Sequence, residues 1–98
     1  MIPEITESIQ NTKVMRIWYH PGERVIEPHA LGVTKDGHHV LRAWQRSGAS
    51  ASHEHENWKL FRLDRTDDVE PMGQSFDGPR PGYNPDDKAM KRGFIARL

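Results

Sequence analysis

Apolar and polar residues alternate along several short stretches of this chain, the pattern typical of β-strands with one buried face. In residues 13–20, Met15, Ile17 and Tyr19 fall on one face, and the residues between them fall on the other. The same kind of pattern, or an extended apolar run, recurs later in the chain. The further predicted strands are residues 24–33, 38–45 and 58–65, followed by a short fifth strand or extended segment around Phe76.

Helical patterns are confined to the two ends. Residues 3–12 predict one short helix, because Pro3 suits a first helical turn and Ile5 with Ile9 makes an apolar pair one turn apart. Near the other end, Asn84 and Pro85 form a helix-start signal that predicts a short helix over residues 85–97. We therefore expect a barrel domain in residues 1–76 and a Pro/Gly-rich tail in residues 77–98.

Short turns join the predicted strands. Pro21-Gly22 and Asp36-Gly37 are both turn signals, the second being typical of a hairpin. Pro28, inside the second extended run, implies an edge position, a bulge or a bend. Antiparallel strands in so short a chain favour a mainly β fold, a small Sm-like or SH3-type barrel of about five strands with the N-terminal helix on one opening.

Composition narrows the range of functions. The chain has 98 residues and a mean hydropathy of −0.84, with 14 basic and 14 acidic residues, so any anion binding must use a local basic surface. There is no cysteine, which excludes disulfides and thiolate chemistry. No apolar run approaches a membrane span, and the N-terminus lacks the features of a signal peptide, so we expect a cytoplasmic protein without membrane contacts.

Three segments carry a resemblance to a known family. They are the run Arg24 to Leu31 after a strand ending in Tyr, the run Val40 to Ala43 after the Asp-Gly turn, and the closing motif Phe61-Arg62-Leu63-Asp64-Arg65. Over residues 5–76 the chain resembles the WYL domain, a small Sm-like barrel of bacterial transcription regulators and of some defence proteins. Of the triplet that names the family, only the Leu is present, in His39-Val40-Leu41. We expect a stand-alone domain without the helix-turn-helix domain usual in the family.

The resemblance implies a function. WYL domains are thought to sense ligands, including single-stranded nucleic acid, and to pass the signal to an attached domain. The function expected here is a regulatory binding module for single-stranded nucleic acid or an anionic small ligand. The alternative is an interaction or oligomerisation module of a bacterial regulatory or defence system, with a second copy or a regulator as its partner.

Arginines are the first candidates for the binding site, because the planar guanidinium suits phosphate and carboxylate groups. Barrel geometry can bring arginines of different strands to one face, or each can pair with a nearby acid such as Glu23, Glu27 or Asp64. The candidates are Arg24, Arg42, Arg62 and Arg65.

Aromatic residues and one histidine complete the candidate set. Trp44 and Trp58 are candidates to stack on nucleobases, whereas Tyr19 is expected in the core. His29, next to Pro28, is the histidine expected to face a ligand.

Other chemistry has little support in the sequence. His53 and His55 resemble metal ligands, but they lie in a polar loop without an assigned third ligand, so we predict no metal site. No catalytic triad, phosphate loop or carboxylate pair stands out. We expect no catalytic residues and no cofactor, and therefore no enzyme.

Overall fold

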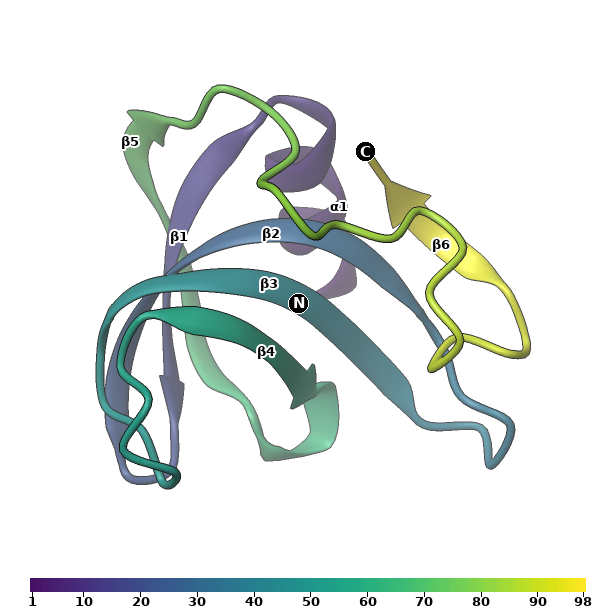
Figure 1. Ribbon diagram of the computed structural model, residues 1–98, viewed down its shortest axis with the longest axis horizontal. Helices are drawn as coiled ribbons and strands as arrows, with labels where there is room; N and C mark the ends of the chain where they lie inside the picture. The colour runs from purple at the N-terminus through teal and green to yellow at the C-terminus, as the bar shows by residue number, and fades with distance from the viewer.

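The computed structural model describes all 98 residues and contains one α-helix and six strands (Figure 1). The elements, in chain order, are α1 (Ile2–Gln10), β1 (Lys13–Tyr19), β2 (Gly22–Val33), β3 (His39–Gly48), β4 (Asn57–Arg62), the 3-10 turn η1 (Leu63–Arg65), β5 (Asp67–Ser75) and β6 (Phe94–Arg97). The single helix has nine residues, and no helix of the protein is long and apolar enough to cross a membrane.

All six strands belong to one antiparallel sheet. Five of them follow the order β4-β3-β2-β1-β5, and β6 pairs with the second half of β2. Figure 1 shows β2 and β3 as long curved strands that cross over β1 and β5, so that the sheet bends into a partly open barrel with α1 beside it. The predicted mainly β fold with an N-terminal helix is confirmed, and β6 is an addition to the five expected strands.

The main core lies on the inner face of the bent sheet. Ile5 and Ile9 of α1 pack against apolar side chains from four strands, all of them fully buried or nearly so. The strand residues of this core are Met15, Ile17, Ile26, Leu31, Leu41, Ala43 and Phe61. Tyr19 packs against the core, as expected. Met15, Ile17 and Tyr19, which the alternation placed on one face of the first strand, therefore all lie on the core side of β1.

Pro28 lies in the central strand β2, at an irregularity in its pairing with β3. Pro28 pairs with Ala43 and Ala30 pairs with Arg42, so His29 is the extra residue of a bulge. A bulge accommodates a proline, which has no N–H for a ladder hydrogen bond. Of the three alternatives that Pro28 implied, an edge position, a bulge or a bend, the structure shows the bulge.

The segment after β4 differs from the expected strand. β4 ends at Arg62, and residues 63–65 form the 3-10 turn that leads into β5. The Thr66 hydroxyl donates to the Arg62 carbonyl oxygen at 2.7 Å, which holds this turn closed. β5 is longer than the predicted fifth strand, and almost all of its residues are exposed, so hydrophobic alternation could not reveal it.

The predicted helix over residues 85–97 is absent. Residues 85–92 form turns, and residues 94–97 form β6. The backbone of this segment is hydrogen bonded to β2 instead: Val33 N–H donates to the Gly93 carbonyl at 3.0 Å, and Arg92 N–H donates to the Val33 carbonyl at 3.0 Å. Gly93 has φ +114°, a positive backbone angle that is incompatible with a right-handed helix and that glycine adopts without steric cost. Residues 76–98 are called the C-terminal tail below.

Gly32 provides the space in which the C-terminal tail packs on β2. A Cβ at Gly32 would lie 2.6 Å from the Gly93 carbonyl oxygen and 2.7 Å from the Met90 sulfur. Met90 is buried there against Ala30 and Val40, in a second, smaller core. The lack of a side chain at position 32 is therefore a condition for the docking of the tail.

We expect Gly32→Ala to push the tail away from β2 and to lower the free energy of unfolding by about 1–3 kcal/mol, the usual cost of overpacking. Amide hydrogen exchange should accelerate in residues 90–97 more than in β1. Gly22→Ala, at the other end of β2, is the control, since its Cβ would meet only the Ala49 side chain at 3.2 Å. Equal exchange of the tail in both variants would contradict this role of Gly32.

Candidate ligand-binding groove

The outer face of β3 and β4 carries the residues that point away from the core. Because the strands are antiparallel and in regular register here, these side chains form opposed pairs across the two strands. The pairs are Trp44 opposite Trp58, Arg42 opposite Leu60, and Val40 opposite Arg62. Three of the predicted site residues, Arg42, Trp44 and Arg62, therefore share one face.

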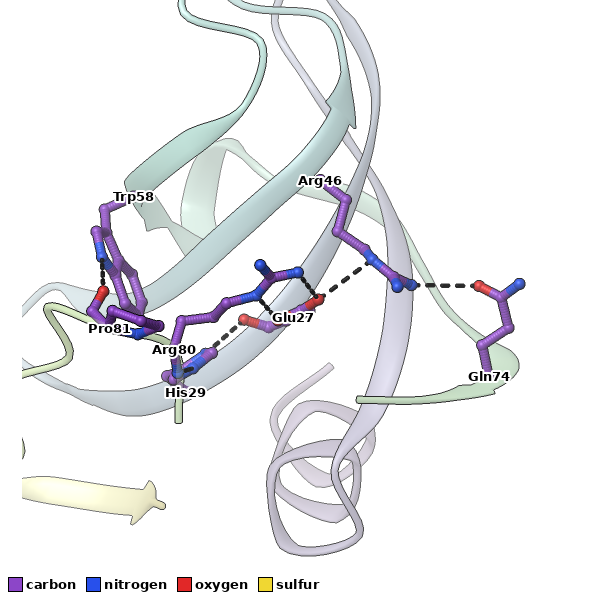
Figure 2. Close-up of polar contacts among 7 residues, drawn as sticks. All are labelled: Glu27, His29, Arg46, Trp58, Gln74, Arg80 and Pro81. Atoms are coloured by element: carbon purple, nitrogen blue, oxygen red, sulfur yellow. Dashed lines mark hydrogen bonds and ion pairs between the residues drawn. The ribbon is translucent and has the colours of Figure 1, made fainter. Parts of the chain in front are cut away.

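The C-terminal tail is fixed to this face by a buried carboxylate (Figure 2). Glu27 of β2 is 1% exposed and accepts two hydrogen bonds from Arg80 of the tail, at 2.8 Å from Nε and 2.9 Å from a terminal nitrogen. Arg46 of β3 approaches the same carboxylate, with its Nε 3.2 Å away. The Arg80 guanidinium also lies 5.2 Å from the centre of the Trp44 ring. A buried carboxylate needs such partners, because an unpaired charge is costly to bury.

His29 lies under the tail rather than toward solvent. It is fully buried, and its ring lies 4.8 Å from the Trp58 ring and 5.4 Å from the Phe76 ring. Its Nδ1 is 2.8 Å from the Glu27 carbonyl oxygen, and its Nε2 accepts from the Arg80 backbone N–H at 3.1 Å. Both ring nitrogens are therefore used within the protein, in the neutral tautomer that carries its proton on Nδ1. Burial lowers the pKa of His29 below its ordinary value.

Where the tail leaves this anchor, it borders a groove of about 360 Å³. Trp58 forms one wall, and the Tyr83 ring lies 6.2 Å from it in a stacked arrangement. The Trp58 indole N–H donates to the Pro81 carbonyl at 3.2 Å, which fixes the orientation of the ring (Figure 2). The residues that line the groove are Arg42, Trp58, Gly82, Tyr83, Asn84, Asp87 and Lys88. This set is called the tail groove below.

Two cations and one carboxylate set the charge of the tail groove. Arg42 is half-buried and pairs with Asp87, with 2.7 Å between Nε and Oδ2. Burial acts to raise the pKa of Asp87, but the hydrogen bonds from Arg42 and from the Ala89 backbone N–H outweigh it, so the pKa is lowered. Lys88 is exposed and has no carboxylate within ion-pair distance. The tail groove thus has a net positive charge beside two aromatic rings.

Arg24 lies apart from this face. It is 4% exposed, and its guanidinium is next to the Tyr19 and Phe61 rings, 5.2 Å and 5.4 Å from their centres. Its nitrogens donate to the backbone carbonyls of Tyr19 and His20 and to the Gln45 side chain. Burial lowers its pKa. The structure therefore gives Arg24 an internal position, without contact to the other candidate arginines.

Arg62 and Arg65 lie toward the other end of β4. Arg62 pairs with Asp64 through two hydrogen bonds, at 3.0 Å and 2.6 Å, and this pairing raises the pKa of Arg62 and lowers that of Asp64. Arg65 belongs to η1 and is exposed, with no carboxylate within ion-pair distance. The four arginines thus do not converge, and only Arg42 lies in the tail groove.

The remaining members of the groove come from the tail, which the sequence placed outside the barrel. Asn84 was interpreted as the start of a helix that would have included Asp87 and Lys88. Tyr83 and Asp87 could not be selected from local patterns, because they contact residues of β4 and β3 that lie more than twenty positions away in sequence. The sequence allowed each candidate arginine to pair with an acidic residue, but it did not identify Asp87 as the partner of Arg42. No group of three or more His, Cys, Asp or Glu side chains is placed to hold a metal ion.

The protein is thus a bent antiparallel sheet with a helix beside it and an open, partly aromatic groove on its outer face. The WYL domain family model matches residues 1–71, and the chain belongs to this family. WYL domains are ligand-sensing regulatory modules rather than a known enzyme family. Searches of curated proteins and of solved structures found no match. The match ends within β5, so the tail side of the groove lies beyond the matched residues.

The two arginines that pair with Glu27 should contribute unequally to the stability of the protein. Arg80→Ala removes two hydrogen bonds and the contact with Trp44, so we expect it to lower the free energy of unfolding by about 2 kcal/mol. Arg46→Ala, the matched control, removes one longer contact with Glu27, at 3.2 Å, and a long hydrogen bond to the exposed Gln74, at 3.4 Å, and should cost about 0.5 kcal/mol. Urea denaturation of the two variants measures the difference, and equal losses would show that the Arg80 contact does not anchor the tail.

His29 should make stability depend on pH. Because its pKa is lowered in the folded protein, the unfolded chain binds the proton more readily below the ordinary value of 6.5. The stabilising contribution is complete above that pH and is lost as the pH falls through the folded pKa, at about 1.4 kcal/mol per unit of pKa difference. Urea denaturation at pH 7.5 and 5.5 should show a larger loss for the wild type than for His29→Gln. Identical pH dependence would exclude His29 as the cause.

Proposed function

We propose that this WYL domain senses an anionic ligand that carries a planar ring, either single-stranded nucleic acid or a small molecule of the same chemistry, and that it binds this ligand in the tail groove. The observation that supports the proposal most is the meeting of Arg42 and Lys88 with Trp58 and Tyr83 around one open cavity. Arginine and lysine bind phosphate groups, and exposed faces of aromatic rings stack on bases without strong sequence preference.

The volume of the groove fits one ring and one anionic group. At about 360 Å³ it lies at the small end of ligand pockets, so a longer strand would have to continue outside it. Leu60, 38% exposed, follows Trp58 on the same face of β4, and Arg62 comes next. We infer that a single strand would continue over Leu60 toward Arg62 and Arg65, whereas a small ligand would use the tail groove alone.

Fluorescence anisotropy of labelled single-stranded DNA and RNA oligonucleotides, at two salt concentrations, tests the proposal. We expect binding that weakens with salt, because phosphate contacts release counterions. Lys88→Ala should weaken it about tenfold, the effect of losing one contact of about 1.4 kcal/mol. Lys91→Ala is the matched control, since Lys91 is an exposed lysine of the same tail that does not line the groove.

Competition separates the two ligand sources. Displacement of the oligonucleotide by a mononucleotide at similar affinity would assign the site to a small ligand, and weak displacement with a further loss in Arg62→Ala or Arg65→Ala would assign it to a strand. Equal affinity of the wild type, Lys88→Ala and Lys91→Ala proteins would place any binding outside the tail groove.

A further inference from the structure

Asp87 occupies the position that the anionic group of a ligand would take on Arg42. Its two carboxylate oxygens face the arginine fork, at 2.7 Å from Nε and 3.4 Å from a terminal nitrogen. This two-point geometry is the one in which arginine binds phosphate as well as carboxylate. The Asp87 side chain is only 9% exposed and Arg42 is 28% exposed, so both charges are largely withdrawn from water while they remain paired.

The same pair holds the middle of the tail to the barrel. On one side of it, Arg80 is anchored on Glu27 and His29; on the other, Met90 fills the space over Gly32. Between these anchors, residues 84–89 make one set of hydrogen bonds to strands β1–β5, and that set is Asp87 with Arg42. Their other hydrogen bonds are local or go to Arg97 of β6.

The pair is also easy to exchange for another anion. A ligand phosphate on Arg42 would keep the guanidinium paired, so the cost of leaving a half-buried cation alone does not arise. The released Asp87 carboxylate would move into solvent and regain its hydration. Lys88, the next residue, is exposed and lines the groove, so its charge would attract the incoming anion.

We propose that Asp87 is an internal competitor of the ligand, and that an anion bound to Arg42 releases residues 84–89 and loosens the pairing of β6 with β2. This inference rests on the proposed function and adds a means by which occupancy of the groove changes the structure of the tail. A ligand shifts such an equilibrium only if it binds the released state better, and competition for one arginine fork provides that difference.

Hydrogen exchange of the wild-type protein, with and without a saturating labelled oligonucleotide, tests the release directly and needs no variant. We expect the probe to accelerate exchange at the amides of Ala89 and Met90, and at those of β6, while β1 and β3 stay protected. Binding with unchanged or slower exchange in the tail would overturn the competition and would leave the proposed binding function intact.

Asp87→Asn tests the competition from the other side. The variant keeps a polar side chain that can accept from the Ala89 backbone N–H but removes the negative charge, so we expect affinity for the oligonucleotide to rise about fivefold to tenfold. The tail should exchange faster before any ligand is added, with little further increase on binding.

Asp86→Asn is the matched control, because it makes the same change of charge one residue away, on a side chain that is 91% exposed and does not line the groove. An equal rise in affinity in both variants would reveal a general effect of charge and would overturn the inference. If neither the wild type nor Asp87→Asn binds the oligonucleotide, a mononucleotide or inorganic phosphate, the proposed function itself fails and the inference with it.

Discussion

The buried carboxylate of Glu27 is the constraint on which the arrangement of this protein depends. It lies on the outer face of the central strand, where a small β domain would ordinarily meet water, and Arg80 and Arg46 hold it there. Because Arg80 belongs to the C-terminal tail, satisfying this charge also fixes the path of the tail across β2 and β3. Tyr83 and Asp87 lie further along that path, so the pairing of Glu27 helps to position the residues that line the groove.

Much of the fold could be predicted, because it depends on local patterns. The alternation of Met15 and Ile17 gave the inner face of β1, and Pro28 gave a bulge as one of its three options. The tail was misread for a reason that is equally physical. Asn84 and Pro85 satisfy a local helix signal, but hydrogen bonds to β2 and the left-handed Gly93 hold the following backbone extended, and such long-range contacts leave no periodic trace.

The candidate site was less accessible to sequence reasoning than the fold. Arginine chemistry selected Arg42 and the aromatic residues included Trp58, and both line the groove. Residue type alone, however, does not distinguish a guanidinium in a groove from one in the interior. Arg24 shows the difference: its donors are used by backbone carbonyls beside two rings, so its charge serves packing. His29 is similar, since its ring nitrogens bind the Glu27 carbonyl and the Arg80 backbone.

The groove is formed by two parts of the chain, strands β3 and β4 and the C-terminal tail, which differ in how strongly the core constrains their residues. Arg42 and Trp58 stand on strands whose opposite faces form the core, so changes there put the barrel itself at risk. Residues 82–88 are divided in this respect: Tyr83 packs against the second core and Asp87 pairs with Arg42, whereas Asn84 and Lys88 are exposed. Recognition could therefore be varied at the two exposed positions of this segment: a library at Asn84 and Lys88, on an unchanged barrel, would sample new ligand preferences and leave the packed residues in place.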